Sequence, residues 1–407
     1  MLRRQIISII KSKNTNWKKN LVFLVFAQFI AMVGMSACVP FLPMFVRELG
    51  IINLNEAKFW SGLVFAGPYF LSMFAVPVWG MLGDRYGRKP MVVRAIIGLA
   101  IAMYLMGFSQ NVWQLFLLRV FQGAVSGFIA ASLAFTSAET PNEHSGYAIG
   151  MLQSAQFAGT IIGPLFGGII SDIAGMRHVF IIVAILCLLS GLTVIFYVKE
   201  NNFIKSTGVK ITILDNFKYI NKYIELKLLL LFVVLATAGI QFTAPIFPFF
   251  VEALHAPPKY LSTITGILVG IVGVFSIIFT PGWGSRNDKK DYRKTLKIAS
   301  LVVGLATIAQ LFVPNYLYLF PIRIIIGIFL GAIIPTLYTA LSKRSAHDNI
   351  GGIMGIASSA NLFGSLISFL SVGVIASQFG NTACFLLSGG LLLIVYILTS
   401  VKSSLSL

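Results

Sequence analysis

The stretch GMLGDRYGRKP at 80–90 places one carboxylate among three basic side chains, directly after an apolar run. Gly80 and Asp84 are four residues apart, so they share one face of a helix that continues into this stretch. An aspartate in this position can accept hydrogen bonds from a neighbouring helix N-terminus, and a glycine lets that helix approach closely. Arg88 and Lys89 suit acidic groups or lipid phosphates. An ordinary basic loop would explain the bases, but not Asp84 or the glycine spacing.

Arg119 and Arg323 are the other chemically distinctive residues, because each stands inside a long apolar run. All 13 acidic residues lie at the ends of such runs or between them. No acid–base or nucleophile cluster occurs within the runs, which argues against an enzyme. The 3 cysteines have no zinc-like spacing and the 4 histidines lie in loops or at run ends. We therefore expect no metal site, no disulfide framework and no cofactor.

The composition identifies the class of protein. The chain has 407 residues, of which 57% are hydrophobic and 11% charged, and its mean hydropathy is +0.88. Soluble domains carry about 25% charged residues, so this chain is predicted to cross a membrane many times. Most of the basic residues that produce the net charge of +18 lie between the apolar runs, and they form no basic face. That distribution is typical of cytoplasmic loops and excludes nucleic acid as the expected partner.

Cutting the chain at polar positions yields twelve runs of roughly 20 residues, the length that spans a bilayer. The apolar run that starts at Leu21 is too long for a signal peptide and is predicted to be an uncleaved first span. The predicted spans are residues 20–46, 57–82, 91–108, 112–136, 146–170, 178–198, 227–251, 260–281, 295–312, 316–341, 351–376 and 381–401.

The distribution of basic residues predicts the orientation. When bases in the first four residues of a span are counted with the adjoining loop, 25 of the 31 Lys and Arg residues fall on one side of the twelve spans and 4 on the other. The remaining 2, Arg119 and Arg323, lie deeper within spans. The positive-inside rule therefore places both termini and the stretch 199–226 in the cytoplasm.

The two halves of the sequence repeat each other. PFLPMFVREL (40–49) matches PIFPFFVEAL (245–254) at an offset of 205, and PVWGMLGD (77–84) matches PGWGSRND (281–288) at 204. Arg119 and Arg323 match at the same offset of 204. The predicted fold is therefore all-α, with twelve transmembrane helices in two pseudo-symmetric six-helix bundles. The bundles are predicted at 1–198 and 227–407, joined by a cytoplasmic linker at 199–226.

The fifth span contains GTIIGPLFGG, a glycine-rich stretch with one proline at residues 159–168. Its glycines give a thin helix face for close packing, and the proline removes a backbone hydrogen bond and permits a bend. The matching stretch GSLISFLSVG (364–373) keeps only the outer glycines, so this bend is predicted for the first half alone. The residues concerned are Gly159, Gly163, Pro164, Gly167 and Gly168.

Three motifs resemble those of one family. The pattern G-x-L-x-D-R-x-G-R-K from Gly80 to Lys89 is similar to the loop 2–3 signature of the major facilitator superfamily. L-x-x-x-R-x-x-Q-G, which starts at Leu115, resembles its span 4 motif, and GTIIGPLFGG resembles the span 5 motif of its proton-driven exporters. The second copy of the loop keeps Gly284 and Asp288 but lacks a match to Gly87 and has one extra residue.

The resemblance implies a twelve-helix drug:proton antiporter of the cytoplasmic (inner) membrane, which works by alternating access around a central cavity. Its implied partners are a small-molecule substrate, protons and membrane lipids, and it is expected to be a monomer. The residues implied in gating are Gly80, Asp84, Arg85, Gly87, Arg88, Lys89, Gly284 and Asp288. The span 4 motif implies Arg119 and Gln122 in coupling or substrate contact. To these we add Arg323, which has the same setting in the second half, and Glu139 as the best candidate for a coupling carboxylate, since no acidic residue lies within a span.

Polar residues within the spans are candidates for lining the cavity, although each could equally make a hydrogen bond between helices. They are Gln28, Ser36, Gln153, Gln156, Gln241 and Asn361. A cavity with fixed positive but no negative charge disfavours organic cations. We therefore expect neutral or anionic substrates, such as a drug, a metabolite or a siderophore-like chelator, with Arg119 as the main anion contact. An uptake permease for a small organic solute and a substrate-sensing receptor are the alternatives.

Overall fold

The computed structural model describes residues 2–200, 219–289, 291–344 and 350–404, and every regular element in this part of the chain is helical. Most of the predicted linker at 199–226 lies outside these residues. The elements of the first half are α1 (Leu2–Cys38), η1 (Val39–Phe41), α2 (Leu42–Glu48), α3 (Leu54–Tyr86), α4 (Arg88–Gly107), α5 (Val112–Ala124), α6 (Phe128–Glu139), η2 (Asn142–His144), α7 (Ser145–Ala174) and α8 (Met176–Tyr197).

The second half has the same order of long helices. Its elements are α10 (Ile224–Gln241), η3 (Ala244–Ile246), α11 (Phe247–Ala253), η4 (Pro258–Tyr260), α12 (Leu261–Lys289), α13 (Tyr292–Ala309), η5 (Gln310–Phe312), η6 (Tyr316–Tyr318), α14 (Leu319–Arg344) and α15 (Ile350–Ser404).

The number of membrane passes follows from the last helix. Eleven stretches of the described chain are long and apolar enough to cross a membrane, and the last of them, Ile353–Ser400, has 48 residues. A helix of that length measures about 72 Å, more than twice the roughly 30 Å hydrocarbon core. Gly380 interrupts it with φ 79° and ψ −180°. The stretch therefore makes two passes, which agrees with the twelve predicted spans.

Two predicted spans are less regular than the sequence suggests. The first bends through η1, where Pro40 stands at the start of a short turn before α2. The fourth is interrupted at 125–127, between α5 and α6, where Gly127 adopts φ 106°. Glycine tolerates this left-handed conformation, which other residues rarely adopt. The matching helix of the second half, α14, continues without such an interruption.

The repeat is visible in matching contacts. The Trp79 indole donates to the carbonyl of Ala124 at 2.7 Å, and the Trp283 indole donates to that of Ile328 at 2.8 Å. Both donors and both acceptors are 204 residues apart. These hydrogen bonds tie the second and fourth spans of each half together in the same way.

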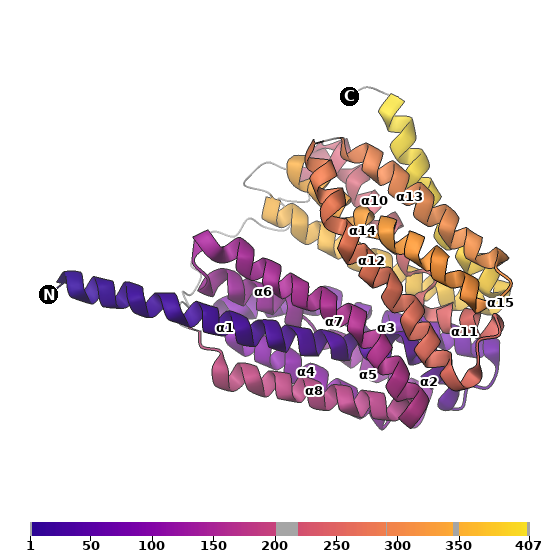
Figure 1. Ribbon diagram of the computed structural model, residues 1–407, viewed down its shortest axis with the longest axis horizontal. Helices are drawn as coiled ribbons and strands as arrows, with labels where there is room; N and C mark the ends of the chain where they lie inside the picture. Colours follow the sequence, from indigo (N-terminus) through magenta and orange to yellow (C-terminus); the bar gives the residue numbers. More distant parts are fainter. Residues whose placement is uncertain (1, 201–218, 290, 345–349, 405–407) are drawn as a thin grey trace.

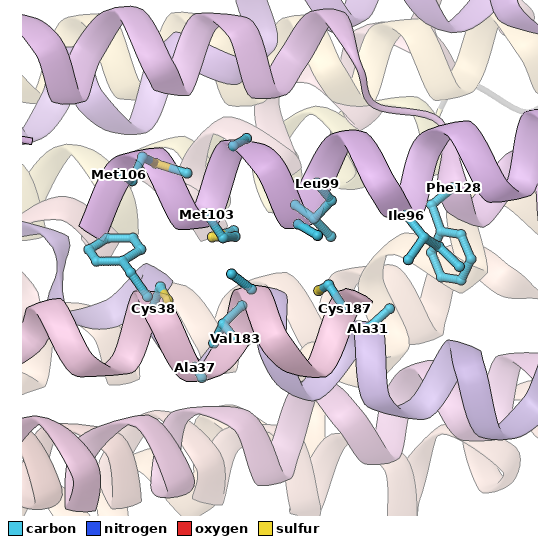
Figure 2. Close-up of a cluster of buried hydrophobic side chains, with 14 of the residues drawn as sticks. Ala31, Ala37, Cys38, Ile96, Leu99, Met103, Met106, Phe128, Val183 and Cys187 are labelled. Carbon is cyan, nitrogen blue, oxygen red and sulfur yellow. The ribbon is translucent and has the colours of Figure 1, made fainter. Parts of the chain in front are cut away.

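The largest buried cluster among the described residues is built mainly from the first half, and Figure 2 shows the part of it where α1, α4 and α8 meet. Met103 and Leu99 of α4 point toward Val183 and Cys187 of α8 in this view. Small residues of α1, such as Ala31, are fully buried here and let the three helices pack closely.

The two halves meet at one end of the molecule and diverge toward the end from which the N-terminal part of α1 projects (Figure 1). Helices α3 and α7 of the first half contact α15 and α12 of the second. We call the end with Arg47 and Glu252 the closed end. The opposite end, which carries Lys89 and Arg344, is called the basic end.

Candidate functional site

The closed end is held by carboxylates that reach across the two halves. Asp172, near the end of α7, accepts hydrogen bonds from the backbone nitrogens of Ser262 and Thr263, at 3.1 and 2.7 Å. These nitrogens belong to the first turn of α12, where the helix dipole favours an anion. Arg47 and Glu252 form an ion pair at 2.7 Å at the same end.

Glycines allow the halves to touch along this interface. A Cβ at Gly62 of α3 would lie 2.7 Å from the Cα of Gly373 on α15, and one at Gly168 of α7 would lie 2.7 Å from the Ser262 carbonyl. Phe369 packs against the ring of Phe65 at 5.4 Å between centroids. The backbones are therefore too close for side chains larger than hydrogen at these positions.

The glycine motif of the fifth span packs against two neighbouring helices, α1 and α12. A Cβ at Gly159 would lie 2.6 Å from Met32, and one at Gly163 would lie 2.6 Å from the Val33 carbonyl, both on α1. Gly167 meets the backbone of Ala37 on the same helix. The carbonyl group of Pro164 instead faces Gly266 of α12, so one helix carries contacts both within its half and across to the other.

Arg119 is fixed inside the first half and is 5% exposed. Its Nε donates to the Val64 carbonyl at 3.1 Å, and its Nη1 donates to Gln122 Oε1 at 2.6 Å. The sequence predicted an inward-facing charge here, and the structure adds that a carbonyl of the second span and the neighbouring glutamine hold it.

Arg323, its counterpart in the second half, has different surroundings. Its guanidinium lies 3.6 Å from the centre of the Phe247 ring, a cation–π arrangement. Its buried Nε has no hydrogen-bond partner among the described residues. The two repeat-related arginines therefore differ in how firmly the protein holds them.

The loop between the second and third spans is tied to the end of the first half. Gly87 adopts φ 107° between α3 and α4. The Glu200 carboxylate accepts from the backbone nitrogens of Arg88 and Lys89, at 2.8 and 3.0 Å, and Lys89 Nζ donates to the Ile195 carbonyl at 2.8 Å. A carboxylate does bind a helix N-terminus at this loop, but that carboxylate is Glu200.

The remaining loop residues have few contacts in this conformation. No heavy atom of the described neighbours lies within 4 Å of a Cβ placed at Gly80 or Gly284. Arg85 is exposed, with its guanidinium 5.3 Å from the Tyr86 ring centre. The side chains of Asp84 and Asp288 lie outside the described part of the structure, so their predicted roles stay predictions.

The polar candidates for a cavity occupy mixed positions. Ser36 donates to the carbonyls of Met32 and Gly159, at 2.6 and 2.9 Å, and so joins α1 to α7. Asn361 donates to Thr237 at 3.0 Å. The bonds from Ser36 to Gly159 and from Asn361 to Thr237 are of the interhelical kind that the sequence left open as the alternative. Gln28 is 2% exposed and its buried Oε1 has no partner among the described residues, whereas Gln153, Gln156 and Gln241 are partly buried.

Glu139, the predicted coupling carboxylate, ends α6 and is 7% exposed.

The sequence missed Arg94, which lies near the break that precedes α6. Arg94 donates to the carbonyls of Val125 and Ser126, at 3.2 and 3.0 Å, and its guanidinium stacks 3.6 Å from the Trp79 ring centre. These bonds satisfy carbonyls that the interruption frees from the helix, as an apolar surrounding requires.

A duplicated bundle of membrane-spanning helices, closed at one end and with repeat-related arginines within the spans of both halves, is the architecture of a transporter. Residues 24–212 and 229–403 match the family model of the Major Facilitator Superfamily, and the chain belongs to this superfamily. It is 32% identical over 381 residues to the multidrug resistance protein MdtG of Salmonella schwarzengrund and to that of Salmonella typhimurium, covering 93% of this chain and 94% of each relative.

Solved structures share the fold. The nucleoside transporter NupG has a TM-score of 0.80 at 13% identity, covering 94% of this chain and 98% of that one. The human organic anion transporter MFSD10 has a TM-score of 0.68 at 14% identity, with coverage of 94% and 99%. A bacterial homologue of the lysosomal transporter Spinster, inward-facing and unoccupied, has a TM-score of 0.77 at 15% identity, with coverage of 95% and 97%.

Proposed function

We propose that this transporter exports small neutral or anionic amphiphilic molecules across the cytoplasmic membrane by proton antiport. The similarity to MdtG over most of both chains supports multidrug efflux. The observation that carries the substrate class is a pair of arginines within the spans at repeat-related positions, Arg119, which is buried, and Arg323, which is partly buried. Neither forms an ion pair with a carboxylate among the described residues. A pathway with such charges favours anions and repels cations.

Alternating access follows from the geometry of the two ends. We propose that the basic end faces the cytoplasm, in accordance with the positive-inside rule, and that both termini lie there. The structure is then the inward-facing state, because the halves meet at the opposite end (Figure 1). Transport requires the contacts of the closed end to break while the basic end closes.

Proton coupling is assigned to Glu139, which is nearly buried beside the basic end. A carboxylate at this place would exchange a proton with the cytoplasm in the inward-facing state. An acidic substrate that carries its own proton is the second route that we consider.

Efflux from loaded, pump-deficient cells tests the proposal, with a panel of anionic, neutral and cationic amphiphiles and a proton uncoupler as one arm. We expect uncoupler-sensitive efflux of neutral or anionic compounds, and its loss in Glu139→Gln and Arg119→Gln. Strong efflux of organic cations that Arg119→Gln leaves unchanged would refute the substrate class alone. Accumulation of solute by intact cells would favour the uptake permease. The nucleoside transporter NupG shares the fold with this chain, and at 13% identity the likeness extends to the fold alone.

A further inference from the structure

The two halves differ at one equivalent corner of the basic end. In the first half, α1, α4 and α8 meet there, and an anion of the chain itself fills the corner. The Glu200 carboxylate binds the N-terminus of α4 by accepting hydrogen bonds from the backbone nitrogens of Arg88 and Lys89. Asn20 and Lys199 close the corner with a reciprocal pair of hydrogen bonds, at 2.7 and 2.9 Å.

In the second half, α10, α13 and α15 meet at the matching corner and leave a cavity of about 100 Å³. At an offset of 205, Glu225 corresponds to Asn20, and the basic pair Arg293–Lys294 corresponds to Arg88–Lys89. The residue in register with Glu200 is Leu405, which lies outside the described residues and has no carboxylate. The sequence of the second half therefore lacks the anion that fills the first corner.

The side chains around this cavity are suited to an anion. Arg293 and Arg344 both line it, together with Tyr292 and Glu225. Arg344 pairs with Glu225 through Nη1 alone, and its guanidinium lies 5.4 Å from the Tyr292 ring centre. A single carboxylate thus stands between two guanidinium groups. Helices α10 and α13 both begin at this corner, so their dipoles add positive potential.

The exposed carboxylate of Asp291 also contributes to the charge at this corner. It accepts from the backbone nitrogen of Arg293 at 3.0 Å and so caps α13. This bond engages only the backbone of Arg293, whose guanidinium instead hydrogen-bonds the Tyr292 side chain at the edge of the cavity. Arginine guanidinium groups bind phosphate oxygens in a planar, bidentate manner, which makes phosphate the matching anion.

We propose that this cavity, lined by Glu225, Tyr292, Arg293 and Arg344, binds the phosphate of an anionic phospholipid. Apolar residues at the same corner favour a lipid over a soluble phosphate, because Ile224 is 59% and Leu398 36% exposed beside the guanidinium groups. The volume equals that of a few water molecules at ~30 Å³ each, room for a phosphate group. Basic pockets between membrane helices bind such headgroups in other proteins.

Native mass spectrometry and thermal unfolding of the purified full-length protein in detergent test this proposal. The probes are phosphatidylglycerol, diacylglycerol with the same acyl chains, and glycerol 3-phosphate. We expect phosphatidylglycerol alone to remain bound and to raise the unfolding temperature. Arg293→Gln combined with Arg344→Gln should weaken its binding at least tenfold, and each single variant provides the same test if the double variant does not fold.

Two further variants separate a phosphate site from a structural ion pair. Glu225→Gln removes the competing carboxylate and should tighten phosphatidylglycerol binding, whereas a purely structural Arg344–Glu225 pair predicts weaker binding. Arg286→Gln is the matched control, because Arg286 is a partly buried base of α12 that does not line the cavity. Equal stabilisation by glycerol 3-phosphate would show a soluble ligand and overturn the lipid assignment. Undiminished lipid binding by the double variant would overturn the site.

Discussion

Arg47 and Glu252 occupy equivalent positions of the two halves, 205 residues apart, and pair with each other. Arg47 Nη1 donates to both carboxylate oxygens, at 2.9 and 2.7 Å. Equivalent residues of a duplicated bundle meet only close to the axis that relates the halves. The pair therefore lies at the centre of the closed end and joins the halves where they must separate during transport.

Breaking this ion pair is expected to loosen the closed end slightly. The two side chains are 41% and 39% exposed, and exposed pairs contribute at most about 1 kcal/mol, or roughly a fivefold change in population. Labelling of a cysteine introduced at Ser262 by a membrane-impermeant maleimide measures the opening, since Ser262 is 5% exposed between the halves. Arg47→Ala should accelerate labelling up to about fivefold, and Arg47→Glu with Glu252→Arg should restore it. An unchanged rate in Arg47→Ala would contradict this role.

Loss of the Asp172 charge is expected to have a larger effect. Asp172 accepts two backbone hydrogen bonds from the N-terminus of α12, and a partly buried charge at a helix end contributes up to ~2 kcal/mol. Asp172→Asn should therefore accelerate the Ser262→Cys labelling by more than Arg47→Ala does. Asp291→Asn is the matched control, because Asp291 caps a helix without crossing between the halves. Equal labelling in both aspartate variants would argue against a cap that joins the halves.

The fifth span should be far less tolerant of side chains than its counterpart in the second half. A Cβ at Gly163 would meet Ser36 Oγ and lie 2.6 Å from the Val33 carbonyl, so Gly163→Leu should abolish transport and Gly163→Ala should reduce it. Ser368, the matching residue, already holds a side chain that donates to the Ala238 carbonyl at 3.0 Å. Ser368→Leu should be milder in an efflux assay at matched expression. Similar losses at both positions would exclude a hinge that is specific to the first half.

Asp84 is expected to act when the basic end closes. The Cβ position of Gly80, one turn earlier on the same helix, has no neighbour within 4 Å among the residues that the structure describes, so we expect a packing partner to arrive with closure. Asp84→Asn should insert normally and transport poorly, as measured by efflux and by the amount of protein in the membrane. Asp288→Asn should do less, since its loop lacks a match to Gly87. Wild-type flux in a well-expressed Asp84→Asn protein would remove Asp84 from the mechanism.

The sequence predicted the spans and the inward-facing arginine well, because hydrophobic length and the cost of a buried charge are local properties. It also predicted that the glycines of the fifth span pack closely, and the structure supplies their partners on α1 and α12. The break at 125–127 was missed, since no proline marks it and Gly127 is an ordinary glycine in an apolar run.

The carboxylate partners could not be predicted for a different reason. Asp172 and Ser262 are 90 residues apart, and Glu200 and Arg88 are 112 apart. Each contact depends on how the bundles pack, which no single segment encodes. The sequence predicted this role for Asp84, and that prediction stays untested because the Asp84 side chain lies outside the described part of the structure. The folded chain shows Asp172 and Glu200 in such a role.

The hydrogen bond from Trp79 to Ala124, which we call the tryptophan brace of the first half, has a consequence for how the protein is made. Trp79 bonds Ala124, and Gly123 packs on the backbone of Pro68, so both contacts are complete once residue 124 has entered the membrane. Chains fold from the N-terminus as they are synthesised. The second and fourth spans can therefore lock together while the ribosome is still translating the second half, whose own brace, Trp283 to Ile328, forms later and independently.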